Sequence, residues 1–310
     1  MRTGQYRRAS TFAQYADRSS SRSEPRLFEK HMFTAGGSDV TYQWTGNAVN
    51  NILTTYLNYT VENNTVNTWL NDLELFSIST INNGIQTWTV PQTGSYTITA
   101  KGAAGSAGHP QNSGNTLGGN GAIMEGTFDL EKGEKIEILC GQIGMYGNRG
   151  GGGGGGTFVV KSGATTANYS THILVIAGGG GGGGYGSNHD GVDASTGESG
   201  TFASDGTGGP GENGNGGDDT ILDDDTGSPG SWSGAPGAGF LTDATLFTDN
   251  FASYEWGQTK AHAFLRTTDR GKGGVGSGTH GDGGYGGFGG GGSPSMEGGG
   301  AEKVFVNLAN

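Results

Sequence analysis

Residues 150–184 read GGGGGGGTFVVKSGATTANYSTHILVIAGGGGGGG, two pure glycine runs separated by two apolar segments. The alternation predicts a strand pair, Phe158–Lys161 and His172–Ala177, around a polar loop at 162–169. The runs at 150–156 and 178–184 thus directly adjoin predicted strands. A flexible linker usually mixes glycine with serine and has no need of adjoining strands. The pattern therefore favours ordered glycine segments over tethers.

Ordering a glycine run costs more conformational entropy than ordering any other sequence. An extended helix with three residues per turn has no internal hydrogen bonds, so its N–H and C=O groups must bond to neighbouring chains. Only glycine lets backbones approach that closely. We therefore expect a bundle of polyglycine II helices in which many hydrogen bonds, each worth about 1 kcal/mol, offset the entropy together.

The composition agrees with an ordered, glycine-built chain. Glycine supplies 67 of 310 residues, while hydrophobic residues make up 31% and charged residues 15%. No G-X-Y period runs through the chain and there are only 7 Pro, which excludes collagen. The 5 Trp, 11 Tyr and 13 Phe argue against simple disorder, and no apolar run is long enough to span a bilayer.

Upstream of the glycine runs, apolar residues alternate with polar ones. Residues 85–100 read as a hairpin turning at 91–94, with Trp88, Val90, Tyr96, Ile98 and Ala100 as its apolar members. Residues 122–130 alternate again, with Ile123, Phe128 and Leu130 as the larger members. After a turn at 131–134, Ile136, Ile138 and Cys140 share one face of the next strand. Many short strands of this kind predict a mainly β fold, an antiparallel sandwich or jelly roll.

The expected domain order follows from these composition changes. We divide the chain into a basic arm at 1–37, a β domain at 38–177, a glycine-rich region at 178–300 and a terminal strand at 301–310. The glycine-poor stretch 240–269 reads as an aromatic insertion within the glycine-rich region.

The charge distribution separates the arm from the body. Net charge is -12, which disfavours nucleic-acid binding, yet seven of the 17 Lys and Arg lie in residues 1–30. The arm is either a disordered tail or a segment that orders by docking on a larger assembly. In the docking interpretation its anchors would include Arg7, Arg8, Phe12 and Tyr15.

Cysteine content and the N-terminal sequence indicate in which cellular compartment the protein assembles. Cys140 is the only cysteine, so an intrachain disulfide is excluded, and the opening residues contain no apolar signal segment. These features predict assembly in a reducing compartment, and we expect Cys140 to be a buried strand residue with no catalytic part.

Catalytic patterns are missing from the sequence. The six His form no HExxH, Ser-His-Asp or Cys-His spacing, and the many GxGxxG matches lack a strand–turn–helix frame. We expect neither an enzyme nor a cofactor. Residues 214–221 differ at one position from a calcium-binding repeat, but a single copy cannot stack. A solvated acidic loop is expected there, with Asp218, Asp219 and Asp223 kept as calcium candidates.

Isolated aromatic residues amid glycine are the candidate contact residues. Such residues on a rigid platform can anchor glycans or proteins, or can instead seal the sides of the bundle. The residues concerned are Tyr185, Trp232, Tyr285 and Phe288.

Several short motifs together carry a family resemblance. They are WTVP (88–91), SYTI (95–98), KGAAG (101–105), CGQIG (140–144), the run at 150–156 with TFV, IAGGGGG (176–182) and GGYGGFGGGG (283–292). The chain resembles, over about 85–300, the glycine-rich domain family found in the ectodomains of anaplastic lymphoma kinase and leukocyte tyrosine kinase and in viral and phage adhesins. The resemblance implies a tumour necrosis factor-like jelly roll with inserted polyglycine helices, often trimeric, whose loops at the helix ends bind partners.

The resemblance and the arm together give a functional expectation. The 310 residues show no signal segment, cysteine pair, apolar span or kinase motif like those of the receptors, so we do not expect receptor signalling to carry over. We expect a non-enzymatic virion protein of the capsid, tail or fibre that displays its glycine-rich domain, with possible attachment to host-surface glycan or protein. It would be a homo-oligomer bound to other virion proteins through the arm. The alternative is a ligand-binding module of a cell-surface or extracellular protein.

Overall fold

A computed structural model describes residues 33, 72–79, 84–108, 116–146, 150–184, 190–197, 199–201, 210–217, 237–245, 260–274 and 286. The chain divides into two compact units, Met1–His31 and Met32–Asn310, and every described residue lies in the second. That part is mainly β, with antiparallel sheets and one short helix.

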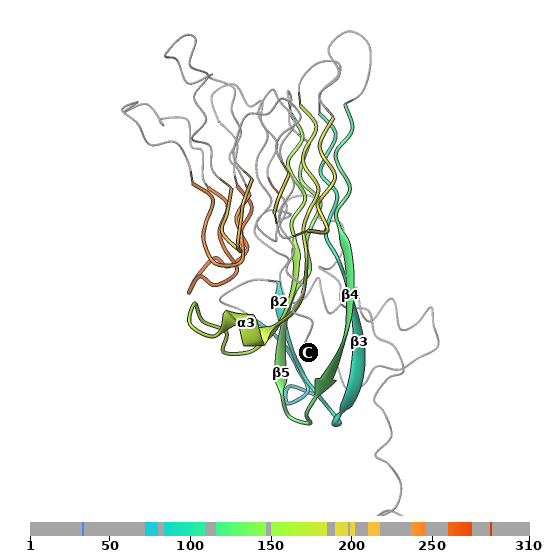
Figure 1. Cartoon of the computed structure of the whole chain (residues 1–310), viewed down its shortest axis with the longest axis vertical. Helices are drawn as coiled ribbons and strands as arrows, with labels where there is room; N and C mark the ends of the chain where they lie inside the picture. The colour runs from blue at the N-terminus through green and yellow to red at the C-terminus, as the bar shows by residue number, and fades with distance from the viewer. Residues whose placement is uncertain are drawn as a thin grey trace, which may run out of the picture. The chain divides into compact units, whose positions relative to one another are not determined.

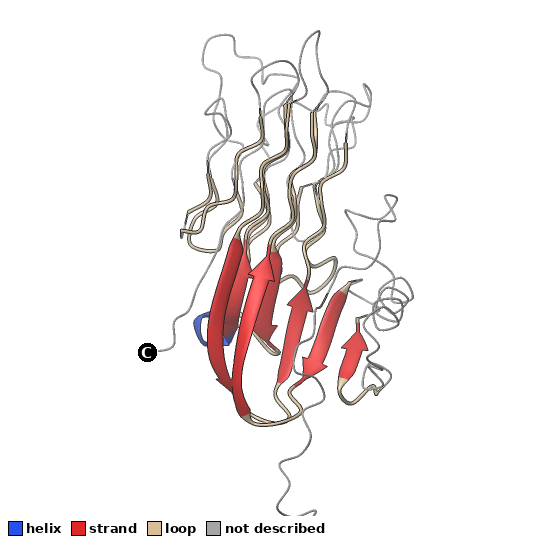
Figure 2. Cartoon of the chain, turned by 90° about the vertical axis from the view of Figure 1, so that its right-hand side faces the viewer, coloured by secondary structure: helices blue, strands red, loops and turns tan. Residues whose placement is uncertain are grey.

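The larger sheet has five antiparallel strands in the order β1-β2-β5-β6-β7 (Figure 2). Their bounds are β1 Phe76–Ile78, β2 Ile85–Thr89, β5 Lys135–Leu139, β6 Thr157–Lys161 and β7 Ile173–Ala177. All five residues of β7, ILVIA, are buried, and its Ile and Val side chains favour a strand because β-branched residues pack well on a pleated surface. The predicted pairing of the two segments around 162–169 is confirmed, although helix α3 (Tyr169–His172) takes His172 out of the strand.

The smaller sheet pairs β3 (Gly94–Lys101) with β4 (Ile123–Leu130), from Gly94 opposite Leu130 to Lys101 opposite Ile123. Both strands alternate between exposed and more buried positions, as their sequences predict. Ile123 is an exception to the expected apolar set, since it is 60% exposed and shares its face with Glu125 and Thr127.

The hairpin predicted for 85–100 is wrong. β2 pairs with β1 and β5, whereas β3 pairs with β4 in the other sheet. Val90 still bonds to the turn at 131–134, through Val90 N to Glu134 O and Gly133 N to Val90 O, both 2.8 Å. The chain then crosses to the second sheet, where the Tyr96 ring meets the Trp88 ring edge-on at 5.4 Å. The alternating apolar residues therefore face one another between sheets, which a period of two cannot distinguish from pairing within a sheet.

A cluster of aromatic rings joins both ends of the glycine-poor stretch 240–269 to the larger sheet. Phe158 of β6 lies 5.2 Å from Phe264 and 6.2 Å from Phe240, and all three rings are buried. Arg270 covers the Phe264 ring at 4.3 Å and donates to Glu137 of β5 at 2.6 Å. The described ends of 240–269 thus contribute to the core of the sheet.

Glycine-rich segments continue strands β3 to β7 beyond the sheets (Figures 1 and 2). With one further segment they number six in the described chain, namely 102–108, 116–122, 141–146, 150–156, 178–184 and 190–194. Backbone hydrogen bonds of 2.7–3.1 Å join them at a spacing of three residues. For example, the amides of Gly102, Gly105 and Gly108 donate to Ala122, Gly119 and Thr116, while Ala103 and Ser106 donate to Gly155 and Gly152.

Segment 178–184 lies at the centre of this array. It bonds to segments 102–108, 116–122, 150–156 and 190–194, and all seven of its residues are buried. A Cβ on Gly180 would overlap the carbonyl of Gly119, and one on Gly179 the carbonyl of Gly154. Glycine is required at 179, 180, 182 and 183 because neighbouring backbones occupy the space of a side chain.

None of the helices in the described ranges is long and apolar enough to cross a membrane.

Candidate functional site at the ends of the glycine segments

The ends of the glycine segments remote from the sheets form the candidate site. Segments 102–108 and 116–122 run antiparallel, and so do 150–156 and 178–184. The described residues that flank 109–115, 147–149 and 185–189, namely Gly108 and Thr116, Tyr146 and Gly150, and Gly184 and Asp190, therefore all lie on this side (Figure 1). We call these described ends the tip.

Hydrogen bonds between different segments hold the tip together. The hydroxyl of Thr116, which is 1% exposed, donates to the Gly184 carbonyl at 2.8 Å. Gly183 donates to Ser106 at 2.9 Å and accepts from Gly151 at 2.8 Å. Because these bonds join four segments, the described segment ends have fixed relative positions.

Apolar side chains are exposed on the outer segments near the tip. Tyr146 is 54% exposed, Ile143 47% and Leu117 62%. Tyr146 is also paired through its backbone with Gly151, immediately beside the reversal at 147–149. These are amphipathic or apolar groups on a supported backbone, the arrangement that suits contact with a partner surface.

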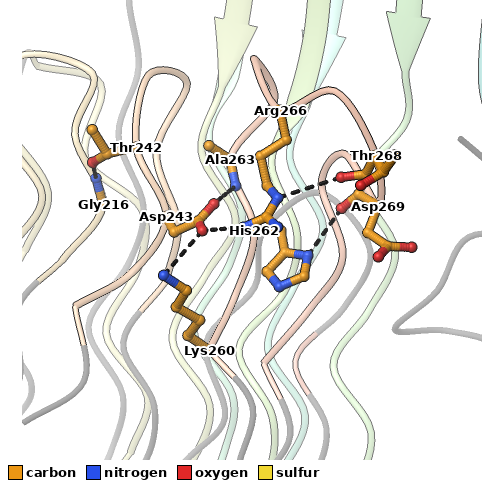
Figure 3. A network of polar contacts seen from close by, with 9 residues as sticks. All are labelled: Gly216, Thr242, Asp243, Lys260, His262, Ala263, Arg266, Thr268 and Asp269. Carbon is orange, nitrogen blue, oxygen red and sulfur yellow. Dashed lines mark hydrogen bonds and ion pairs between the residues drawn. The ribbon is translucent and has the colours of Figure 1, made fainter. Parts of the chain in front are cut away.

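Apart from the tip, a cluster of polar residues around Asp243 lies in the described part of 237–274 (Figure 3). Asp243 accepts from the Ala263 amide at 2.9 Å, pairs with Lys260 at 3.1 Å, and forms a short ion pair with Arg266. Burial would raise the pKa of Asp243, but the Ala263 amide and the two cations outweigh it, so that the pKa lies below its ordinary value. With three donors on one carboxylate, Asp243 ties two chain segments together and is poorly suited to accept a further proton.

His262 belongs to the same group. Its Nδ1 lies 3.2 Å from the Asp269 carbonyl oxygen. Burial and the nearby Arg266 charge lower the pKa of His262, an effect that Asp243 opposes only in part. The ring is therefore neutral at pH 7 and adds no charge to the cluster.

Cys140 directly follows β5, on the face predicted for it, although the residue is partly exposed. Its sulfur lies 3.9 Å from the Gln86 side-chain nitrogen. Burial of the thiol raises the pKa of Cys140 to about 12, which keeps it protonated and unreactive near neutral pH.

The residues singled out from sequence lie outside the described ranges. This holds for the contact residues Tyr185, Trp232, Tyr285 and Phe288, the arm residues Arg7, Arg8, Phe12 and Tyr15, and the calcium candidates Asp218, Asp219 and Asp223. Within the described ranges, His, Cys, Asp and Glu form no group of three or more that could hold a metal ion.

The sequence analysis did not identify Asp190 and Asp193 as structurally important. Asp190 and Asp193 accept backbone amides of segment 116–122 at 2.7 and 2.6 Å. Their spacing of three, which matches the hydrogen-bond spacing of the array, was the signal available in the sequence.

No protein-family model matches this chain.

Proposed function

We propose that this protein is a non-enzymatic structural component of a virus particle, in the capsid, tail or fibre, which presents the tip for attachment to a host surface. The observation that supports this most is that the described segment ends flanking 109–115, 147–149 and 185–189 lie together at one hydrogen-bonded end. Loops on a rigid scaffold lose less entropy on binding than loops on a mobile one. Ordering the glycine array costs much conformational entropy, and a need to present loops rigidly would explain why the protein contains such an array.

The proposed architecture is a jelly-roll sandwich resembling tumour necrosis factor, extended by polyglycine II helices. Support for the helices comes from the three-residue hydrogen-bond spacing and from segment glycines that lie outside the positive-φ set of Gly84, Gly133, Gly163, Gly214 and Gly271. Support for the sandwich comes from the antiparallel strands and the contact between Trp88 and Tyr96. The resemblance to the glycine-rich domain family adds to both.

In this proposal the basic arm binds other virion proteins, and copies associate as homo-oligomers, with a trimer as the first candidate. Of the arm residues the structure describes Phe33, whose ring lies 6.3 Å from Phe76 and 6.2 Å from Trp88 on the larger sheet.

Deleting residues 1–31 tests the arm while retaining Phe33. We expect the truncated chain to remain folded by circular dichroism but to be absent from particles purified from infected cells.

Replacing 185–189 by Gly-Ser residues tests the tip. That variant should enter particles yet lose adsorption to host cells, with a Gly-Ser replacement of 165–168, at the sheet side, as the matched control. Normal adsorption of the 185–189 variant would exclude the tip as the attachment surface.

A further inference from the structure

Four buried glycines of the array make no hydrogen bond to any other described residue. They are Gly179 and Gly182 on segment 178–184, and Gly153 and Gly156 on the neighbouring segment 150–156. Within each pair the two glycines are three residues apart, so in an extended helix with three residues per turn they share one row. We call these four residues the unbonded rows.

Burial distinguishes the unbonded rows from a solvated edge. Gly118 and Gly121 on segment 116–122 also take part in no backbone bond among the described residues, but they are only partly buried, so water can satisfy them. Water has little access to the unbonded rows, and buried backbone groups almost always have a hydrogen-bond partner. Since the rows are buried within a single copy, the partner should come from the same chain.

A side chain on the adjoining segment 141–146 also lacks a partner. Gln142 is 8% exposed, and its backbone carbonyl accepts the Gly155 amide at 2.9 Å. Its side-chain oxygen is buried and has no hydrogen-bond partner among the described residues. Unmet acceptors and donors thus occur on segment 150–156 and on a segment bonded to it.

The tract GGYGGFGGGG at 283–292 has the sequence of a further array segment. Eight of its ten residues are glycine, and its two side chains, Tyr285 and Phe288, are three residues apart. In the described array, side chains at that spacing, such as Ile143 and Tyr146, are exposed. A three-residue helix of this tract would have two rows made only of glycine.

One described residue connects this tract with the larger sheet. Gly286, the one described member of 283–292, is buried and donates to the Gly274 carbonyl at 2.9 Å. Gly274 ends the described stretch 260–274, in which Phe264 stacks on Phe158 at 5.2 Å. Phe158 belongs to β6, which directly follows segment 150–156. Contacts between described residues therefore lead from the tract to the strand that adjoins an unbonded row.

We propose that residues 283–292 bind to the unbonded rows as a further polyglycine helix, with Tyr285 and Phe288 directed away from the array. Backbone N–H and C=O groups at a three-residue spacing on both partners then satisfy one another. The two aromatic residues, which are candidate contact residues, project from a supported backbone. The proposal concerns the body and does not depend on the attachment function.

The test places methyl groups on different rows of the tract in the full-length chain. Gly289→Ala with Gly290→Ala puts one on each glycine-only row. The matched control, Gly291→Ala with Gly94→Ala, extends the row of the two aromatic residues and adds a methyl at Gly94, where a Cβ meets no atom within 4 Å. NMR-detected hydrogen exchange is measured for the four amides of the unbonded rows, with the β7 amides as the reference.

In the wild type we expect these four amides to exchange slowly. The Gly289/Gly290 variant should exchange them at least about tenfold faster with the β7 amides unchanged, and the control should stay within about twofold of the wild type. Fast exchange in the wild type, or equal rates in the two variants, would overturn the proposal. If the Gly289/Gly290 variant also loses β7 protection, nuclear Overhauser effects between the four amides and residues 286–290 of the wild type decide: their presence supports the proposal and their absence overturns it.

Discussion

Gly179 and Gly154 are in backbone contact, so that a Cβ on Gly179 would overlap the Gly154 carbonyl. The two residues belong to neighbouring antiparallel segments, both fully buried. Since the overlapping atoms are backbone atoms, no rotamer change can relieve the clash. Substitution here tests whether close packing of glycine backbones holds the body together.

Gly179→Ala should lower the free energy of unfolding by more than about 2 kcal/mol, in the upper part of the range for overpacking. The measurement is urea unfolding followed by circular dichroism. Gly94→Ala is the matched control, because a Cβ at Gly94 meets no atom within 4 Å. Equal effects of the two substitutions would show that the array is loosely packed.

The amides of Gly180, Gly181 and Gly183, which donate to Ala103, Val192 and Ser106, should exchange slowly with solvent. We expect protection comparable to that of the β7 amides, because opening them requires separating several segments at once. NMR-detected hydrogen exchange gives the rates. Exchange as fast as in an unstructured peptide would contradict an ordered glycine array.

Phe264→Ala should destabilise the protein by about 3–5 kcal/mol, the usual cost of emptying a buried aromatic site. Phe264 is fully buried and stacks on Phe158 and Phe240. Leu73→Ala, at a side chain that is 81% exposed, should change stability by less than about 0.5 kcal/mol. Thermal unfolding of both variants checks the difference.

Asp243 should contribute stability that depends on pH. Its pKa in the folded protein is below the ordinary value of 3.8, so the contribution is complete above that value and is lost as pH falls through the lower folded pKa. Asp243→Asn should therefore be less stable than the wild type at pH 6, and the gap should narrow towards pH 2. A gap that stays constant over this range would mean that the ion pairs with Lys260 and Arg266 carry no net stability.

Cys140 should resist alkylation in the native protein. A thiol with a pKa of about 12 is almost entirely protonated at pH 8, and the thiolate is the reactive form. Iodoacetamide labelling followed by mass spectrometry should be more than about 100-fold slower in buffer than in 6 M guanidinium. Rapid native labelling would place the sulfur in an open, polar environment.

The sequence allowed parts of this fold to be predicted because their signals are local. Runs 150–156 and 178–184 adjoin β6 and β7, and the pairing of those strands follows from the short loop between them. The partners of β2 and β3 were missed, since Trp88 and Tyr96 alternate alike whether they share a sheet or face each other. Phe158 and Phe264 are far apart in the sequence, so their contact cannot be predicted from local periodicity. At the tip, the sequence indicated the glycine segments but gave no partners for Asp190 and Asp193.

Because the segments bond at every third residue, adding one glycine within 178–184 would turn every later donor towards the wrong neighbour. Insertions and deletions inside the array should therefore survive only as multiples of three, whereas a change of length at 109–115, 147–149 or 185–189, between the segments, leaves the register of each segment unchanged. Relatives of this chain would then diversify at one end and keep the rest constant, which is how a rigid body could acquire new binding preferences without refolding.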